Sequence, residues 1–173
     1  MSQSVGRFAE IMAGVRHSAV HLEMRDYYGV EDEMKHFAAF QRGTWAMAAE
    51  RADRRAWLDL VAEAVGRGVS VRRARIVSTT VSDYIRYEHA GTQMNIEAGE
   101  QVRWLARRSV SDLGLPGNDF WLFDDRLVQF NVFDGLGRWV GTDFSEEPDV
   151  VRLCSAAFES VWERAVPHAE FTV

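Results

Sequence analysis

The sequence predicts a single α/β or α+β domain, in which a mixed sheet is covered by helices and ends in an antiparallel meander. Helical and strand-like hydrophobic periods alternate in the first half of the chain, and three strand-like segments follow one another closely in the second half. The chain has 173 residues, a length typical of one domain, and no repeat or linker divides it. We therefore expect residues 1–173 to form one domain.

In the first half, the hydrophobic period switches repeatedly between that of a helix and that of a strand. Val20, Leu22 and Met24 alternate with polar neighbours, which is typical of a strand with one buried face. Glycines follow the helical segments, where the chain must leave the helical conformation. The expected elements are helices at 4–14, 31–42 and 53–65 and strands at 19–28 and 69–77.

In the second half, strands predominate. The segment from Asp134 to Gly137 is the strongest hairpin signal in the chain, and Gly91 is expected to end a short helix. Pro148 suits the first turn of a last helix, whose apolar stripe includes Cys154 and Trp162. The expected elements are helices at 81–90 and 148–165 and strands at 101–108, 119–124, 127–133 and 138–143.

Composition excludes several classes of protein. Hydrophobic residues make up 47% of the chain and aromatic residues 12%, enough for a packed core. No run of about 18 apolar residues occurs, so no transmembrane helix is predicted. Residues 1–14 lack a basic segment followed by an apolar block, so we expect no signal peptide, and the single cysteine fits a cytoplasmic location. A formal net charge of −6 argues against a protein that coats nucleic acid.

Motifs for common cofactors and nucleophiles are missing from the sequence. There is no glycine-rich phosphate loop and no Gly-x-Ser-x-Gly elbow. His17 and His21 are four residues apart, but in a strand this spacing separates them by about 13 Å, too far for a shared metal ion. Cys154 is expected to be an inert buried thiol. We therefore predict no catalytic residue, no metal and no cofactor.

Arginines on two expected strands are the main candidates for ligand binding. Arg73 and Arg75 share one face of the strand at 69–77, and Arg103 and Arg107 share one face of the strand at 101–108. If the strands are neighbours, the four guanidinium groups can converge on a phosphate or a carboxylate. The alternative, which we favour, is that they pair with acidic residues between the strands. Those acidic residues are Asp83, Glu88, Glu97 and Glu100.

A second candidate lies between these strands, where aromatic and charged residues gather within about one turn. Tyr84, Arg86 and Glu88, together with Tyr87, can line the mouth of a pocket or a partner surface. The tyrosines can equally be packed, half-buried, against the sheet. The complete set of candidate ligand-binding residues is Arg73, Arg75, Arg103, Arg107, Tyr84, Arg86 and Glu88.

Five segments of the chain resemble a family of uncharacterised actinobacterial proteins, often encoded beside Xre-type helix-turn-helix regulators in streptomycetes and their relatives. The resemblance implies a small cytoplasmic protein with a regulatory or partner-binding role, and it includes no known catalytic motif. The segments are AVHLEMRDYY (19–28), RARIVSTTVSDYIRYE (73–88), AGE (98–100), DFWLFDD (119–125) and WERAVPHAEF (162–171).

A further resemblance concerns the fold. The order of elements, with FWLFDDRLVQFNVFDG before a final amphipathic helix, resembles one half of a phospholipase D-like domain. Active members carry His-x-Lys-x-x-x-x-Asp. With the motif Asp aligned on Asp125, the His and Lys positions hold Asn118 and Phe120. With it aligned on Asp124, they hold Gly117 and Asp119. The resemblance therefore implies a catalytically dead site.

These observations lead to three hypotheses. The first is a non-enzymatic regulatory protein that acts through a protein partner, such as a helix-turn-helix regulator, without direct contact to nucleic acid or membrane. The second is a small-molecule or anion sensor domain that uses the candidate residues above. The third is a hydrolase or phosphodiesterase with an unrecognised site.

Overall fold

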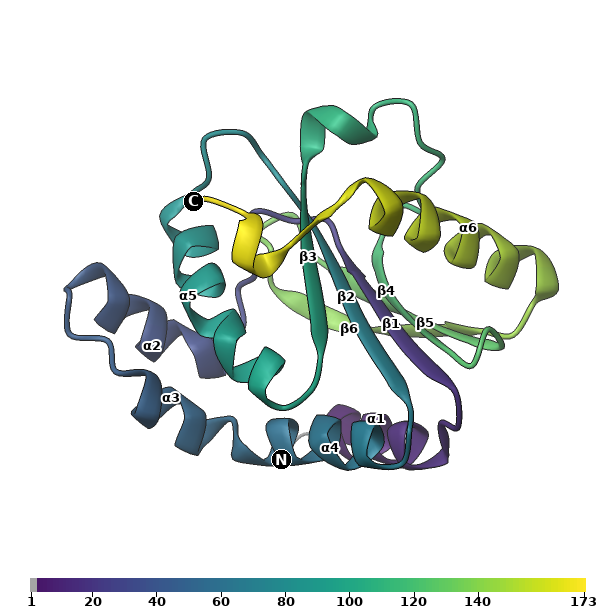
Figure 1. The fold of residues 1–173 in the computed structure, drawn as a ribbon, viewed down its shortest axis with the longest axis horizontal. Helices are drawn as coiled ribbons and strands as arrows, with labels where there is room; N and C mark the ends of the chain where they lie inside the picture. The colour runs from purple at the N-terminus through teal and green to yellow at the C-terminus, as the bar shows by residue number, and fades with distance from the viewer. Residues whose placement is uncertain (1–2) are drawn as a thin grey trace.

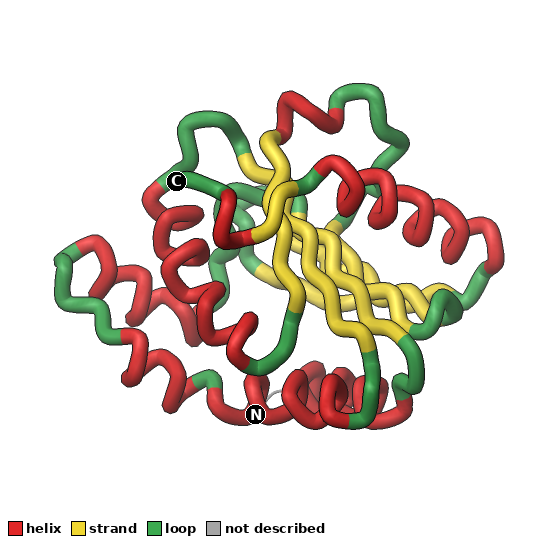
Figure 2. Tube along the Cα trace, viewed as in Figure 1, coloured by secondary structure: helices red, strands yellow, loops and turns green. Residues whose placement is uncertain are grey.

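The computed structural model describes residues 3–173, which form one seven-stranded sheet with helices on both faces (Figures 1 and 2). The strand order is β6-β5-β4-β1-β2-β3-β7. β1, β2 and β3 run parallel, and the other neighbouring pairs are antiparallel. The predicted mixed sheet with a late antiparallel meander is confirmed. The strands are β1 (Ser18–Glu23), β2 (Ser70–Val77), β3 (Gln101–Ala106), β4 (Asp119–Phe123), β5 (Leu127–Phe133), β6 (Trp139–Ser145) and β7 (Val166–Pro167).

Six α-helices and two 3-10 turns complete the described part of the chain. None of these helices is long and apolar enough to cross a membrane. They are α1 (Gln3–Gly14), α2 (Glu31–Gln41), α3 (Met47–Asp53), α4 (Arg55–Gly66), α5 (Asp83–Glu97) and α6 (Pro148–Arg164), with turns η1 (Arg107–Val110) and η2 (His168–Glu170).

Two expected boundaries are wrong. β1 ends at Glu23 instead of continuing to residue 28, because the chain leaves the sheet there and lines a cavity. α5 continues through Gly91 to Glu97. A Cβ at Gly91 would meet Glu50 and Arg54 at ordinary contact distances of 3.8 and 3.9 Å, so this glycine lies within the helix and does not end it. The short helix α3 and the strand β7 were not predicted from the sequence.

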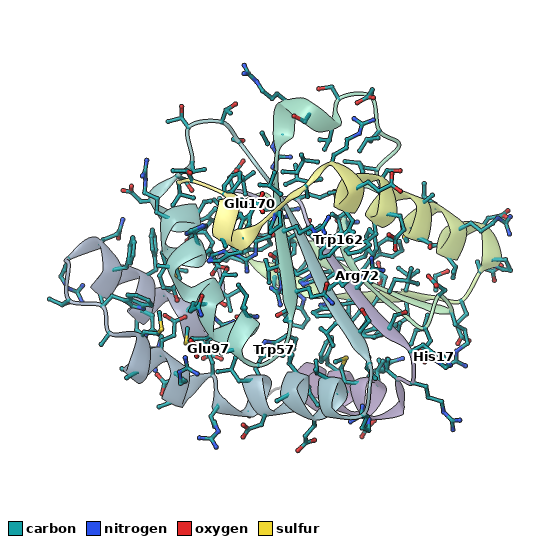
Figure 3. All side chains as sticks on the ribbon, in the orientation of Figure 1. His17, Trp57, Arg72, Glu97, Trp162 and Glu170 are labelled. Carbon is teal, nitrogen blue, oxygen red and sulfur yellow. The ribbon has the colours of Figure 1, made fainter. Side chains whose placement is uncertain are left out.

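One face of the sheet is covered by α6 (Figure 1). The helix packs Cys154, Phe158, Val161 and Trp162 against apolar residues of the central strands. Arg72 lies over the ring of Trp162, with 5.2 Å from its guanidinium carbon to the ring centroid (Figure 3). Burial raises the pKa of the Cys154 thiol to about 11, as expected for an inert thiol.

Two apolar clusters and a polar region between them cover the opposite face. At one end, α1 and α4 pack against Trp121 and Phe123 of β4. At the other end, α5 and α2 pack around Tyr84, Tyr87 and Trp104. Between these clusters, β1 and β2 present polar and charged side chains, which line a cavity.

Candidate ligand-binding site

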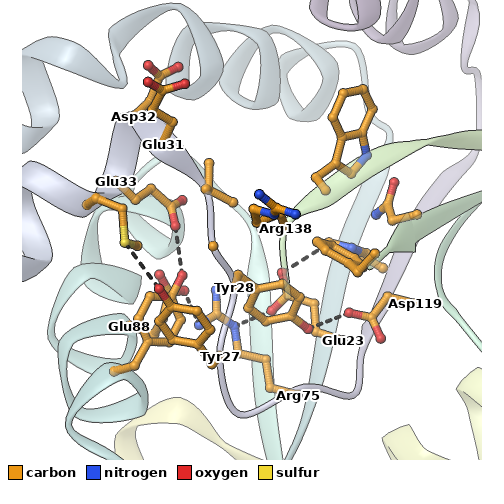
Figure 4. A pocket seen from close by; sticks show the side chains of 18 of the residues that line it. Glu23, Tyr27, Tyr28, Glu31, Asp32, Glu33, Arg75, Glu88, Asp119 and Arg138 are labelled. Carbon is orange, nitrogen blue, oxygen red and sulfur yellow. Dashed lines mark hydrogen bonds and ion pairs between the residues drawn. The ribbon is translucent and has the colours of Figure 1, made fainter. Parts of the chain in front are cut away.

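A cavity of about 1000 Å³ opens between α2, α5 and the β5–β6 hairpin (Figure 4). Its floor comes from the second halves of β1 and β2, through His21, Glu23, Arg73 and Arg75, and from Asp119 at the start of β4. In α/β sheets, ligands commonly bind beyond the carboxyl ends of parallel strands. The cavity lies in such a place and has a volume typical of small-molecule sites.

The arginines on the cavity floor are held by carboxylates. Arg73 donates from Nη1 to Glu23 Oε1 at 2.6 Å and from Nε to Glu100 Oε1 at 2.7 Å. Arg75 donates to Glu88, and its Nε lies 2.6 Å from Glu23 Oε2, close enough for an ion pair although not aligned as a hydrogen bond. Because both guanidinium groups face two carboxylates each, little positive charge is left for an anionic ligand.

A buried polar network continues behind these pairs. Asn95 donates to Glu100 Oε2 at 2.6 Å, and Arg54 donates to Asn95 Oδ1 at 3.2 Å and to Glu50 Oε1 at 3.4 Å. Glu50 also accepts hydrogen bonds from Tyr87 and Trp45. Buried ionic groups are costly unless fully paired, so this network fixes α3, α4 and α5 against β2.

Four of the six carboxyl groups that line the cavity have no ion-pair partner among the described residues, and the two of these that are not exposed are Asp119 and Glu33 (Figure 4). Asp119, 2% exposed, accepts hydrogen bonds from Tyr28 Oη and from the backbone N–H of Met24. Glu33 accepts a hydrogen bond from Tyr84 Oη at 2.8 Å.

Burial raises the pKa of both carboxyl groups. The pKa of Asp119 rises to about 6, because burial and the charge of Glu23 outweigh the hydrogen bonds it accepts and the charge of Arg25. The pKa of Glu33 rises to about 7, because burial and the charge of Glu88 outweigh Arg54 and the Tyr84 hydroxyl. Each carboxyl group therefore keeps its proton more readily than usual, and a cation bound beside it would favour its ionised form.

The side chain of His21 is buried at this site without a hydrogen-bond partner. The residue is 7% exposed, and neither ring nitrogen makes a hydrogen bond. Its Nδ1 lies 3.4 Å from Glu23 Oε1, but the geometry is not that of a hydrogen bond. Burial and the charge of Arg73 hold the pKa of His21 well below its usual range. A neutral imidazole with free nitrogens therefore lines the cavity.

Aromatic rings form the upper walls. Tyr84 packs edge-on against Tyr27 at 5.0 Å between ring centroids, and Tyr28 packs against Phe133 at 5.4 Å. At the rim, Trp139 is 40% exposed. The loop before α2 and the hairpin touch where the backbone N–H of Gly29 donates to the carbonyl of Gly137, so two segments distant in sequence form a common roof.

The structure brings together four of the seven candidate residues from the sequence. Arg73, Arg75, Tyr84 and Glu88 line the cavity. Their role in ligand binding stays a prediction, although the carboxylates assigned to the arginines in the favoured alternative include two that pair with them here, Glu88 and Glu100.

The other three candidates lie elsewhere. Arg103 is on the opposite face of the sheet and donates to the carbonyl of Trp162. Arg107 lies beyond the end of β3, where it donates to the carbonyls of Met24 and Ile76. Arg86 is on the exposed side of α5. The alternative in which four arginines converge is therefore wrong. β2 and β3 are neighbours as expected, but Arg103 stands opposite Ala74 and so points to the other face from Arg73, and Arg107 lies beyond the end of β3.

The residues at the two ends of β4 also differ in role. Asp124 has a positive φ of 51° and accepts hydrogen bonds from the backbone N–H groups of Arg16, His17 and Ser18. These bonds fix the turn at the end of the sheet remote from the cavity. Asp119, at the other end of the strand, lines the cavity.

Sequence reasoning missed most of the cavity wall. His21 was considered only as a metal ligand, and Glu23, Tyr28 and Glu33 were not considered as ligand-binding residues. Asp119 was considered only as a position in the phospholipase D motif. The signal that could have found them is their position next to the carboxyl ends of β1 and β2, once these strands are known to be parallel.

Solved structures with a similar fold include two of different kinds. The first is TrmBL2, described as an archaeal chromatin protein with a novel mode of DNA binding, at 15% identity and a TM-score of 0.51 over 94% of this chain. This chain spans about half of TrmBL2, 49%. The second is Nuc, a phospholipase D family member from Salmonella typhimurium, at 10% identity and a TM-score of 0.52, covering 94% of this chain and 89% of that one.

These similarities concern the fold alone. They support the expected resemblance to a phospholipase D-like domain. They also correct the expectation of a protein partner without direct contact to nucleic acid, because the fold occurs in a DNA-binding protein as well.

A search of curated proteins found no match. A family model does match almost the whole chain, from residue 6 to residue 173, and its description is "domain of unknown function (DUF6879)". The chain therefore belongs to the DUF6879 family.

Proposed function

We propose that this protein is a non-enzymatic sensor domain that binds a small molecule in the cavity between α2, α5 and the β5–β6 hairpin. The observation that carries the proposal is His21, a buried imidazole without a hydrogen-bond partner, on the floor of a cavity of about 1000 Å³. Leaving such a group unsatisfied costs about 1–3 kcal/mol. A bound ligand with a polar group would recover that cost.

The lining supports binding more than catalysis. In the two alignments with the phospholipase D motif, the His and Lys positions hold Gly117 and Asp119, or Asn118 and Phe120, none of which supplies a nucleophile of that type. A regulatory role, implied by the resemblance to actinobacterial proteins encoded beside regulators, would follow if an occupied cavity repositioned α2 and the hairpin. The loop before α2 and the hairpin meet where the backbone N–H of Gly29 donates to the carbonyl of Gly137.

Fragment screening by protein-observed NMR tests the proposal. We expect some neutral or charged fragments to shift the signals of cavity residues and to raise the melting temperature. Asn131→Trp, which places a large ring in the cavity, should abolish these effects. Asp143→Trp, on an exposed position of β6 that does not line the cavity, is the matched control. Fragments that bind both variants equally, or a library that leaves the cavity signals unchanged, would refute the proposal.

A further inference from the structure

We infer that the ligand of this cavity is an organic cation, such as an amine with an apolar body, held by Asp119 and Glu33. This inference rests on the proposed function and names the chemical class of the ligand. It differs from the alternative considered from the sequence, in which the arginines bind an anion.

The charge balance of the lining is the first argument. Six carboxyl groups and four guanidinium groups line the cavity. Arg73 and Arg75 are paired with carboxylates on the floor, Arg54 contacts Glu50, and Arg138 is paired with Asp134 at 2.7 Å. The guanidinium groups are therefore all engaged with protein carboxylates. Glu33 and Asp119, in contrast, have no ion-pair partner among the described residues, so a cationic ligand would supply their missing counter-charge.

The second argument is the chemistry that surrounds these two carboxyl groups. Tyr28 donates to Asp119 Oδ2 and Tyr84 donates to Glu33 Oε2, so each carboxyl group has a phenol beside it. A carboxylate oxygen can accept more than one hydrogen bond, so both groups keep acceptor capacity for a ligand. The rings of Tyr28 and Tyr84 lie 6.3 Å apart between centroids. Aromatic faces beside carboxylates attract ammonium groups, because the ring face is negative.

The third argument is independent of the acidic residues. His21 is more than nine-tenths buried and lines the same cavity, with both ring nitrogens unpartnered. Burial and the charge of Arg73 favour its neutral form, so the imidazole adds a hydrogen-bond acceptor without repelling a cation. Three acidic residues in the first turn of α2 also offset the positive end of that helix, which would otherwise favour an anion.

The test uses three probes that share a phenyl ring and differ in charge: benzylamine, benzyl alcohol and benzoate. Binding is measured at pH 8, where both carboxyl groups are ionised, by protein-observed NMR titration. We expect benzylamine to bind in the cavity and benzoate not to bind. Asp119→Asn and Glu33→Gln should each weaken benzylamine binding about tenfold, the effect of losing one charge-assisted hydrogen bond.

Matched variants keep the result interpretable. Asp143→Asn removes one negative charge from an exposed position outside the cavity and should leave binding unchanged. His21→Phe keeps the ring that stacks on Trp121 and removes the nitrogens, and should also weaken binding. Because Asp119 is deeply buried, each variant is first compared with the wild type by thermal melting. If Asp119→Asn does not fold, the Glu33→Gln variant alone tests the cation inference.

The outcomes separate the two proposals. Benzoate or benzyl alcohol binding in the cavity as tightly as benzylamine would overturn the cation inference and leave the sensor proposal intact. Benzylamine binding that is unaffected by both carboxyl substitutions would also overturn it. If none of the probes shifts a cavity signal while anionic or neutral fragments do, the ligand class is wrong. If no fragment of any charge shifts a cavity signal, both the cation inference and the sensor proposal fail.

Discussion

Arg103 stands opposite Ala74 in the parallel pair β2–β3. This register places the side chain of Arg103 on the face that carries α6, where its guanidinium carbon lies 4.4 Å from the centroid of the Trp162 ring. Arg73, one residue before Ala74, points to the other face and pairs with Glu23 and Glu100. Two arginines that the sequence suggested as partners are therefore separated by the thickness of the sheet.

A comparison of Arg73→Met with Arg103→Met tests this difference. Removal of Arg73 leaves the buried Glu100 without its cation and takes one of two cations from Glu23, and we expect the free energy of unfolding to fall by about 3–5 kcal/mol. Removal of Arg103 loses one hydrogen bond to a carbonyl and one ring contact, worth about 1 kcal/mol. Urea unfolding at pH 7 measures both.

The effect of phosphate on the melting temperature tests whether Arg73 is available to an anion. Since the floor arginines are already paired, millimolar phosphate should not raise the melting temperature of the wild type beyond the effect of sodium chloride at equal ionic strength. Stabilisation by phosphate that disappears in Arg73→Met would show that the guanidinium group is available to anions, contrary to the pairing described here.

Trp121 is expected to be structural. It is 3% exposed, stacks on His21 at 4.2 Å between ring centroids and contacts Phe8 and Trp57. Trp121→Ala should cost about 3–5 kcal/mol, because it opens a cavity in a closely packed cluster. Trp139, 40% exposed at the rim, is the matched position, and Trp139→Ala should cost far less. Equal melting temperatures for the two variants would contradict this core assignment.

The C-terminal segment is expected to weaken in acid. Burial and the charges of His89 and Arg75 lower the pKa of His168 to about 4, while the unfolded value is near 6.5. The unfolded chain therefore binds the proton more readily between these values. Stability contributed by neutral His168 is complete above about pH 6.5 and is lost as the pH falls toward 4.

His168→Gln isolates this effect. Glutamine can still accept a hydrogen bond from Trp104 Nε1, as His168 Nδ1 does at 3.1 Å, but it does not titrate. The decrease in melting temperature between pH 7 and pH 5 should be smaller in the variant than in the wild type. The carboxyl groups of Asp119 and Glu33 act in the opposite direction over this range, since their pKa values are raised, and they are common to both proteins. Parallel pH profiles would contradict the assignment.

Two glycines, one within α5 and one just after it, should respond differently to replacement by alanine. Gly99 has a φ of +98°, and a Cβ there would lie 2.9 Å from Val65 Cγ1. Gly91 is helical, and a Cβ would meet its neighbours at 3.7 Å or more. We expect Gly99→Ala to lower the stability by more than about 1 kcal/mol and Gly91→Ala to raise it by about 0.5–1 kcal/mol. Destabilisation by Gly91→Ala would show that the helix packing at Glu50 is tighter than the distances indicate.

The sequence by itself determined the fold class and most elements, because hydrophobic periodicity is a local property. The alternation at Val20 and Leu22 defined β1, and the stripe of Cys154, Phe158 and Trp162 defined α6. The end of α5 was missed because a glycine such as Gly91 is locally typical of a helix end, whereas the helix continues to Glu97 and packs Tyr84 and Tyr87 into the core.

Only the tertiary structure decided which charged residues meet. The register of β2 against β3 separates Arg103 from Arg73, and the parallel pairing of β1 with β2 brings Glu23 between Arg73 and Arg75. The fold of the loop before α2 then carries Tyr28 to Asp119, a residue 91 positions further along. Strand register and long-range contacts depend on the whole chain packing at once, because no local pattern fixes which of two strand faces will meet. The cavity, its unpaired carboxyl groups and the unsatisfied His21 are consequences of that packing.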